Sequence, residues 1–450
     1  MSHYDPYPEY KDSGAAWLGD VPEHWQVKRV CHVASVIDPQ PDHRAPTLAL
    51  GDGFPYIGIR DINDDGSVNF LTARKIEEHA IIKQEENFSI DDGDIVFCKV
   101  GTLGFPRHIK PHGRLALSAT LVLIKPSDLI DQKYLRYALD ARCTYGQIDF
   151  FSSGSTRAAL SIEQIRGFNI ATPSLSEQRE ISVHLDLETT RIDGLVNKKS
   201  RFIELLREKR QALITHAVTK GLDSNAKMKD SGVPWLEEVP AHWAITYVKR
   251  VIVSIGQGWS PQCESHPAAD DEWGVLKVGC VNGERFRAAE NKALPLTLTP
   301  KPEFGLKKGD VLVSRANTRE LVGSCAVITE DFPRLMICDK LYRLIVNNSK
   351  VSPAFLAMLI SVYGRREVEV EANGASASMV NIAQSVILNL NVALPPFKEQ
   401  LEIISAIETD SAHIDTLISK TLLSIDLLKE RRSALITAAV TGQIDLREVG

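Results

Sequence analysis

The pattern of apolar and polar positions divides the first half of the chain into a strand-rich part and a long helix. Up to about residue 170, apolar runs such as FPYIGIRDI, GDIVFCKV and ALSATLVLIKP alternate with Gly, Pro and Asp, which predicts short β-strands. A short helix is expected near Tyr134–Ala141. From residue 174 to about residue 217 there is no proline and only one glycine, Gly194. This second part is therefore predicted to be one continuous helix.

The second half repeats this organisation. Its apolar runs WGVLKVGCV, GDVLVSR and KLYRLIV predict strands, a short helix is expected near Pro353–Tyr363, and a second long helix follows residue 396. Ser174 with Glu177 three residues later forms the sequence signature of a capping box at the start of the first long helix. About 40 residues at 1.5 Å per residue would make a rod of roughly 60 Å.

Apolar residues recur in both long helices at spacings of three, four and seven, which is typical of a coiled-coil seam. A helix with one apolar stripe must bury it, and the second helix is the obvious partner, so we expect an antiparallel pair. Lys199 and Thr421 interrupt the stripe at matching positions. The residues predicted to pair the helices are Leu185, Ile192, Leu195, Phe202, Leu206, Ile407, Ile414, Leu417, Ile425 and Leu428.

Three motifs show that the chain is an internal repeat. WLGDVPEHW at Trp17–Trp25 recurs as WLEEVPAHW at Trp235–Trp243, EQREI recurs as EQLEI, and EKRQALITHAVTKGLD recurs as ERRSALITAAVTGQID. The four tryptophans of this motif are expected to anchor the core, because identical residues in both halves cannot distinguish two different binding sequences. We predict an α/β or α+β fold with globular domains at residues 1–173 and 226–395 and long helices at residues 174–225 and 396–450.

Composition and charge restrict the class of protein. A chain of 450 residues with 44% hydrophobic and 24% charged residues is typical of a soluble globular protein. The net charge of −6 argues against a generic basic nucleic-acid coat but allows local basic patches. Seven cysteines without a CxxC pair, a polar N-terminus and no long apolar run lead us to expect a cytoplasmic protein with reduced thiols.

Enzymatic motifs are not found in the sequence. ALPPF at Ala393–Phe397 lacks the Asn or Asp that an adenine or cytosine methyltransferase loop requires, and no GxxxxGK[ST] phosphate loop is present. The triplet Glu290-Asn291-Lys292 has no counterpart in the other half, and no metal-binding or cofactor-binding motif was found. We therefore expect catalysis and its cofactors to come from other chains.

The order of domains, together with WLGDVPEHW, P-x-x-EQ-x-EI and KRQALITHAVTKG, resembles the DNA-specificity subunit of type I restriction–modification systems, HsdS. The resemblance covers essentially the whole chain. It implies two target-recognition domains that read the halves of a bipartite, asymmetric DNA site, with the helices setting the spacer between them. It also implies two methyltransferase and two restriction subunits as partners, which would bring S-adenosylmethionine, ATP and Mg²⁺.

Basic and Ser- or Asn-rich stretches are the candidates for DNA contact, since Lys and Arg bind phosphate and guanine edges and Asn reads adenine. For any single residue, a solvated loop or a turn is an open alternative. Lys99 and Arg315 follow the same strand in the two halves. The candidates are Lys99, Thr102, Arg107, Lys110, Arg114, Ser155, Thr156, Arg157, Arg285, Arg287, Arg315, Asn317, Thr318, Arg319, Asn373, Ser376, Ser378 and Asn381.

The ends of the long helices are expected to dock another subunit through apolar residues, namely Leu213, Ile214, Val218, Leu435, Ile436 and Val440. The neighbouring pairs Lys209-Arg210 and Arg431-Arg432 could contact phosphate or stabilise helix C-termini. Two other functions stay open at this stage. One is the specificity chain of a related system that cuts on both sides of a bipartite site, and the other is a scaffold that binds proteins instead of DNA.

Overall fold

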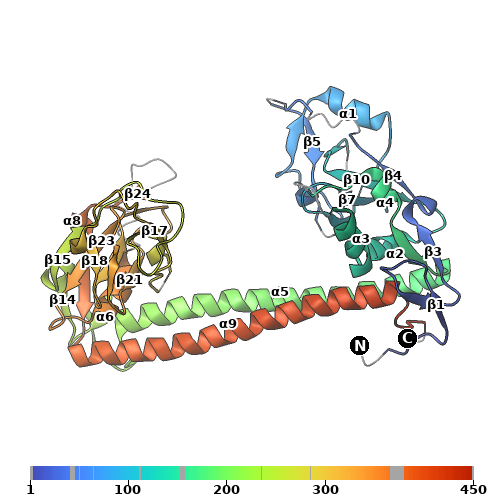
Figure 1. The fold of residues 1–450 in the computed structure, drawn as a ribbon. Helices are drawn as coiled ribbons and strands as arrows, with labels where there is room; N and C mark the ends of the chain where they lie inside the picture. The colour runs from blue at the N-terminus through green and yellow to red at the C-terminus, as the bar shows by residue number, and fades with distance from the viewer. Residues whose placement is uncertain are drawn as a thin grey trace. The chain divides into compact units, whose positions relative to one another are not determined.

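The computed structural model describes residues 4–40, 46–49, 51–63, 65–110, 113–152, 158–234, 236–283, 285–364 and 380–447. The chain forms two compact units: unit 1 is Met1–Arg201 with Thr421–Gly450, and unit 2 is Phe202–Lys420. Two long helices, α5 (Leu175–Lys220) and α9 (Phe397–Val440), each begin in one unit and end in the other (Figure 1). The prediction of one uninterrupted helix in each half is confirmed.

The main sheet of unit 1 is antiparallel and covered on both faces. Its order is β4-β10-β7-β8, formed by Ala34–Ile37, Leu121–Pro126, Ile95–Cys98 and Gly104–His108. All four residues of β7 are buried. Ile95 and Phe97 belong to one hydrophobic cluster, while Val96 and Cys98 belong to another. Because side chains alternate along a strand, the unbroken apolar run IVFC means that both faces of the sheet are packed.

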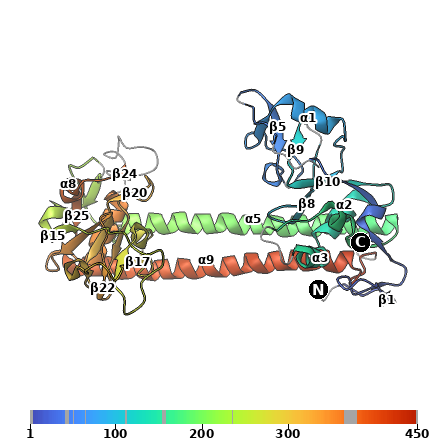
Figure 2. The same ribbon diagram turned by 45° about the horizontal axis from the view of Figure 1, so that its top comes forward.

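Helices and the ends of α5 and α9 pack near this sheet. The helices are α2 (Gln132–Asp140), α3 (Arg142–Ser152) and α4 (Ile162–Arg166), and α2 confirms the short helix predicted near Tyr134. Figure 2 shows α3 beside the end of α9, where the Arg142 backbone N–H donates a hydrogen bond to Thr437 Oγ1 at 3.0 Å. A second sheet has the order β6-β5-β9, made of Arg74–Ile76, Phe54–Ile57 and Ala116–Leu117, with α1 at Glu78–Glu85.

Unit 2 repeats the main sheet with the same strand order. Its strands β15-β23-β19-β21 are Ile252–Gln257, Leu341–Val346, Val311–Ser314 and Cys325–Val327. A second sheet, β17-β16-β22-β18, consists of Asn291–Ala293, Gly274–Leu276, Phe332–Met336 and Gly305–Leu306. Helices α6 (Pro353–Leu359) and α8 (Gln384–Asn389) take the places of α2 and α4 in chain order. The tandem repeat predicted from the sequence is therefore a repeat of the fold.

Paired strands bring each tryptophan segment to the start of a long helix. In unit 1, β1 (Tyr10–Asp12) pairs with β2 (Asp20–Pro22), and β3 (Gln26–Arg29) pairs with β11 (Asn169–Thr172), which leads into α5. The same arrangement recurs in unit 2, where the pairs are β12 (Met228–Asp230) with β13 (Glu238–Pro240) and β14 (Ala244–Tyr247) with β25 (Asn391–Leu394). A short pair, β20 (Ala316–Asn317) with β24 (Val380–Asn381), is also present in unit 2.

The two helices pair antiparallel inside each unit. Arg432 lies 3.1 Å from Asp193 in unit 1, and Arg210 lies 2.9 Å from Asp415 in unit 2. In unit 2, Gly221 after α5 lies beside Glu399 near the start of α9, so residue numbers rise along α5 from Arg210 while they fall along α9 from Asp415. In unit 1, the Tyr134 hydroxyl is hydrogen-bonded to both Ala171 O and Val440 O, which with the Asp193–Arg432 pair gives the same direction. The ion pairs are also equivalent under the sequence repeat, so Arg210 and Arg432 serve the helix pair.

The buried seam of the helices differs from the predicted one at two positions. Leu195 and Phe202 are 41% and 44% exposed, so their assignment to the seam is wrong, and Ile203 is buried in place of Phe202. Leu417 and Leu428 are half-buried. Lys199 is half-buried and Thr421 is buried, so the predicted polar interruption lies in the seam. The predicted seam residues that are buried are Leu185, Ile192, Leu206, Ile407, Ile414 and Ile425.

Candidate nucleic-acid interface

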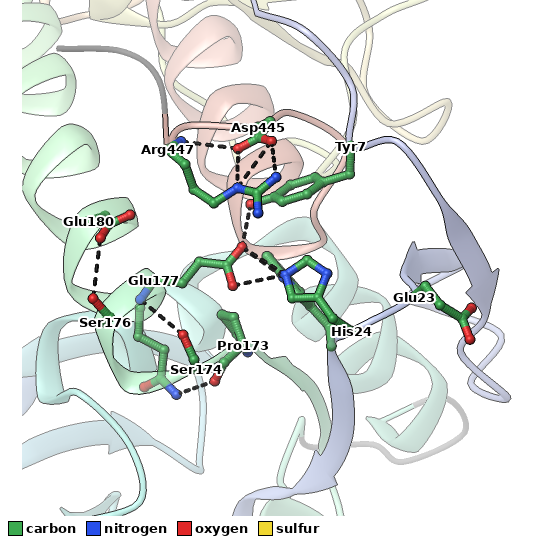
Figure 3. A network of polar contacts seen from close by, with 12 residues as sticks. Tyr7, Glu23, His24, Pro173, Ser174, Ser176, Glu177, Glu180, Asp445 and Arg447 are labelled. Atoms are coloured by element: carbon green, nitrogen blue, oxygen red, sulfur yellow. Dashed lines mark hydrogen bonds and ion pairs between the residues drawn. The ribbon is translucent and has the colours of Figure 1, made fainter.

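Glu177, near the start of α5, attaches the first tryptophan segment to the helix (Figure 3). Its carboxylate accepts hydrogen bonds from Trp25 Nε1–H at 3.0 Å and from the Tyr7 hydroxyl at 2.8 Å, and it lies 3.1 Å from His24 Nε2. The Glu177 backbone N–H donates to Ser174 Oγ at 3.3 Å. Half of the predicted capping box is therefore formed, because the carboxylate binds the tryptophan segment instead of returning to the helix start. Burial, and then the carboxylate, raise the pKa of Tyr7, so its hydroxyl remains a donor.

The same joint is built in unit 2 around Glu399 of α9. Its carboxylate accepts a hydrogen bond from Trp243 Nε1–H at 3.0 Å and lies 2.8 Å from His242 Nε2. Gly221, with φ +77°, ends α5 beside the Trp243 ring, and Gly442, with φ +71°, lies beside Trp25 in unit 1. The three repeated sequence motifs therefore meet at one place in each unit.

The glutamine after each of these glutamates holds the next helix. Gln178 Oε1 accepts a hydrogen bond from the Asp131 backbone N–H at 2.7 Å, at the start of α2. Gln400 Oε1 accepts one from the Ser352 backbone N–H at 2.8 Å, at the start of α6. Sequence reasoning recognised the Glu-Gln dipeptide as a helix start and missed these contacts; its recurrence was the available signal. Each dipeptide ties strands and short helices to a long helix and so gives the loops a rigid base.

Both tryptophans of the joints are buried, which confirms their predicted role as core anchors. Trp25 is 0% and Trp243 is 1% exposed. Trp17 is half-buried, with its ring 5.6 Å from that of Phe150. Trp235 lies outside the described residues. Base stacking is thus not available to Trp25 or Trp243 in this fold.

Both chain ends contribute to the joint of unit 1. The Arg447 guanidinium lies 4.8 Å from the centre of the Tyr7 ring (Figure 3). The Asp445 backbone N–H donates to Asp5 O at 2.7 Å. Hydrogen bonding from Arg447 holds the pKa of Asp445 below its usual range. The Glu177 side chain is 6% exposed and that of Glu399 is 25% exposed, so the glutamate of unit 1 is the more deeply buried of the two.

The predicted subunit-docking residues are largely internal. Ile214 and Val218 belong to the core of unit 2, and their counterparts Ile436 and Val440 belong to the core of unit 1, as does Leu435. These five side chains are at most 8% exposed, so the prediction that they form a docking surface is wrong. The remaining candidate, Leu213, is half-buried and lines a cavity of about 110 Å³ in unit 2.

Lys99 is a buried structural cation. It is 3% exposed, and its ammonium lies 2.5 Å from the Asp38 carboxylate. Its counterpart Arg315 donates to Asp339 O at 3.3 Å, with its guanidinium 6.0 Å from the Tyr342 ring centre. The recurrence of a cation after this strand therefore reflects the shared frame, and the prediction that Lys99 contacts DNA is wrong for this conformation.

Two further cations of unit 1 are engaged within the protein. The Arg107 guanidinium donates to the backbone carbonyl of Ile62. Arg114 lies 2.7 Å from Glu78 and 2.8 Å from Glu85, so two carboxylates neutralise its charge. Arg107 or Arg114 could contact a phosphate only after giving up these hydrogen bonds and ion pairs. Thr102 and Lys110 are exposed, and they keep their candidacy.

In unit 2 the candidates divide in the same way. Asn317 is 8% exposed, and its Nδ2 donates to Asn282 Oδ1 at 2.9 Å, so it supports the loop. The exposed Arg287 is bound to backbone carbonyls, at 2.7 Å from Gly279 O. The candidates with exposed side chains besides Arg287 are Arg285, Thr318, Arg319 and Asn381.

The remaining candidates, Ser155, Thr156, Arg157, Asn373, Ser376 and Ser378, lie outside the described residues. The described residues beside them locate both stretches on the frame. Ala159 forms a β-bridge with Val100 at the end of β7, and Val380 pairs with Asn317 after β19. The described residues that follow both stretches, Ala159 and Val380, thus lie at the same end of equivalent strands.

Among the described residues, no group of three His, Cys, Asp or Glu side chains could hold a metal ion. In the same part of the chain, no helix is both long and apolar enough to cross a membrane. What the described surface does offer is exposed polar, basic and apolar side chains on loops at the end of two equivalent sheets. Loops on a rigid sheet suit the reading of nucleic-acid grooves.

Residues 22–200 match the family model described as the type I restriction modification DNA specificity domain. The specificity subunit of the type I restriction enzyme EcoEI from Escherichia coli is 32% identical over 173 residues, which are 38% of this chain and 29% of that subunit. The StySPI specificity subunit from Salmonella potsdam is 21% identical over 95% of this chain and 90% of its own. The EcoKI specificity subunit from Escherichia coli is 20% identical with the same two coverages.

Solved structures share the fold. A chain from a study of complex assembly and conformational transition of the type I R-M system superposes with a TM-score of 0.68 and 17% identity, over 94% of this chain and 99% of that one. The HsdS subunit from Thermoanaerobacter tengcongensis gives a TM-score of 0.50 and 18% identity, over 94% and 98%. The predicted mixed fold with two domains and two long helices is confirmed by these similarities.

Proposed function

Since the chain belongs to the family of type I restriction–modification DNA-specificity subunits, we propose that each unit reads one half of a bipartite DNA sequence. One observation carries the proposal. Two copies of one frame, joined to the helices by the same Glu–Trp–His contacts, end in loops of different composition at matched positions. A constant frame with different loops is what a protein needs to read two unrelated half-sites with one architecture.

The loops would bind DNA without a strongly basic surface. The net charge of −6 and the neutralised cations Lys99 and Arg114 mean that non-specific phosphate attraction by this chain is weak. Sequence reading would therefore depend on exposed loop side chains, with part of the positive field supplied by partner chains. The exposed candidates that can approach a groove in this proposal are Thr102, Lys110, Arg285, Thr318, Arg319 and Asn381.

The proposed partners are methyltransferase and restriction subunits, two of each, with which the chain would form the complete enzyme. In that assembly S-adenosylmethionine, ATP and Mg²⁺ would bind to the partners, and this chain would contribute no catalytic group. The full-length similarity to type I specificity subunits supports this assembly over a related system that cuts on both sides of its site, and over a scaffold that binds only proteins.

Genome-wide methylation mapping tests the proposal. Long-read sequencing would be applied to cells that co-express the chain with its neighbouring methyltransferase subunit and to cells that lack only the chain. A split motif with a fixed spacer should appear only when the chain is present. Residues 1–173, the strand-rich part of unit 1, would then be replaced by the corresponding segment of another family member. This exchange should change one half of the methylated motif only. Identical methylation with and without the chain would overturn the proposal.

A further inference from the structure

Phe105 is a strained residue that exposes an aromatic ring at a loop end of unit 1. Its φ is +54°, and only one other non-glycine residue of the described part of the chain, Glu237, has a positive φ. The left-handed region is unfavourable for a bulky side chain and persists only where the surroundings enforce it. The Phe105 side chain is nevertheless 46% exposed. The strain therefore does not serve to bury this ring.

Neighbouring residues fix the turn that displays the ring. Gly104 has φ +92°, and a Cβ there would lie 2.8 Å from the Tyr145 ring, so only glycine fits between strand β8 and helix α3. The Tyr145 hydroxyl accepts a hydrogen bond from the Phe105 backbone N–H at 3.1 Å. Leu103 packs against the core of unit 1. The turn is thus anchored on both sides of the strained residue, with the ring left facing solvent.

The equivalent turn of unit 2 keeps the left-handed glycine and carries a different side chain after it. Gly323 has φ +79°, and its N–H donates to Ser314 O at 2.9 Å, as expected for the counterpart of Gly104, which pairs with Cys98. The next residue is Ser324 in place of Phe105. The loop before Gly323 is longer and carries the exposed pair Arg319 and Glu320. The two units therefore share the left-handed glycine and differ at the next residue. Phe105 has a positive φ and donates its N–H to the Tyr145 hydroxyl, whereas Ser324 donates its N–H to Leu321 O at 3.1 Å.

Val100 and Gly101, which precede this turn, contact Ala158 and Ala159 of unit 1. The Gly101 backbone N–H donates to Ala158 O at 2.9 Å, and Val100 forms a β-bridge with Ala159. Ala158 directly follows Ser155, Thr156 and Arg157, which the sequence marks as candidates for phosphate contact. The exposed ring is thus placed on the loop edge on which the sequence reading of unit 1 is proposed to occur.

We propose that Phe105 is a specificity-determining residue of unit 1 that contacts bases of its half-site through its ring; this inference rests on the proposed function. A phenyl ring contacts the thymine C5-methyl group in the major groove or enters a base step as an apolar wedge in the minor groove. Both are apolar contacts with bases and differ in the groove used. A rigid turn suits either contact, because no conformational freedom of the backbone is lost on binding.

The test compares four variants in co-expression with the methyltransferase subunit. Phe105→Ala and Phe105→Gly remove the ring, Phe105→Leu keeps an apolar side chain, and Leu129→Ala removes an exposed apolar side chain near the joint as the control. Long-read methylation mapping should show that the Ala and Gly variants accept other bases at one or two positions of one half-site, with the other half-site unchanged. Discrimination at those positions should fall about tenfold to hundredfold. The Leu129 variant should keep the wild-type motif.

Phe105→Gly distinguishes a loss of base recognition from a loss of stability. Glycine is favoured at φ +54°, so Phe105→Gly should melt at the same or a higher temperature while losing specificity. Tyr145→Phe removes the acceptor that positions the turn and should relax the same positions more weakly. An unchanged motif in the Ala and Gly variants would overturn the inference, as would uniformly weaker methylation without any change in motif.

Two DNA probes identify the groove. Replacement of thymine by uracil at the relaxed positions should weaken wild-type binding and leave Phe105→Ala unaffected if the ring contacts a methyl group. 2-Aminopurine at those positions should become more fluorescent with the wild type alone if the ring unstacks a base step. If neither probe gives a different result for the wild type and for Phe105→Ala, the proposed contact between the ring and a base is refuted. If the wild type itself yields no split motif, the proposed function fails before the variants are considered.

Discussion

Glu177→Gln and Glu399→Gln are a matched pair of substitutions that test how the units are attached to the helices. Glu177 receives hydrogen bonds from Trp25 and Tyr7 and contacts His24, while Glu399 receives one from Trp243 and contacts His242. The Glu177 side chain is 6% exposed, and that of Glu399 is 25% exposed. Glutamine keeps the size of each side chain, so the change removes charge and an acceptor without leaving a cavity.

The expected cost is larger in unit 1. A hydrogen bond to a charged group contributes about 1.5–3 kcal/mol, and a neutral one contributes about 0.5–1.5 kcal/mol. Glu177→Gln weakens three contacts in a buried site and turns the new amide N–H groups toward donors, which should destabilise the joint by about 3 kcal/mol. Glu399→Gln weakens two contacts in a site that solvent partly screens, so we expect about 1 kcal/mol there.

Hydrogen exchange measures each joint separately, which matters because a chain of two units has no single two-state free energy of unfolding. Peptides covering residues 7–25 should lose protection in Glu177→Gln, and peptides covering residues 236–247 should lose less in Glu399→Gln. Each substitution should leave the other unit's joint unchanged. Equal losses of protection in the two variants, or no loss in Glu177→Gln, would refute the argument from the number and burial of the donors.

Four further substitutions test the helix seam, a buried cation and a pH dependence. Ile203→Ala should destabilise the helix pair by about 2–3 kcal/mol, because Ile203 is 5% exposed, whereas Phe202→Ala should cost under about 1 kcal/mol, as measured by hydrogen exchange in peptides of α5. Lys99→Met leaves Asp38 without its cation in a buried site and should cost about 3 kcal/mol, with the salt dependence of DNA affinity unchanged; a reduced salt slope would restore Lys99 as a phosphate contact. Burial lowers the pKa of His108, so the folded chain keeps this ring neutral while the unfolded chain binds a proton below about pH 6.5. Unit 1 should therefore become less stable as the pH falls from 6.5 toward the lowered pKa, and His108→Phe should remove that part of the slope in melting temperature between pH 5 and pH 8.

The parts of the fold that could be predicted are those with long periodic patterns. The uninterrupted stretch from Leu175 to Lys220 and its repeat identified both helices to within a few residues. Which residues face the partner helix was less predictable, because Leu195 with Val196, and Phe202 with Ile203, are adjacent apolar pairs. A helical period fits either member of such a pair, and the larger residue is not the one that faces the partner. Only packing against α9 decides which of the two is buried.

The candidate interface was less predictable because charge alone does not reveal a partner inside the protein. Lys99 and Asp38 are 61 positions apart, and Arg114 meets Glu78 and Glu85 only through the fold. The repeat also gave a misleading signal for Lys99 and Arg315. A cation present in both halves was interpreted as a shared DNA contact, but Lys99 pairs with the Asp38 carboxylate and Arg315 binds the backbone carbonyl of Asp339.

Residues that recognise bases are therefore expected among the positions that differ between the two units. Residues that recur in both halves build the frame, as Glu177 and Glu399 show, because the frame must be the same in both units. A residue that distinguishes two half-sites must instead differ between the units. Phe105 does so, because it follows the left-handed Gly104 where Ser324 follows the left-handed Gly323, and its ring is exposed. Exchange of the two turns should therefore move a reading preference between half-sites without moving the frame, whereas exchange of Lys99 and Arg315 should alter stability alone.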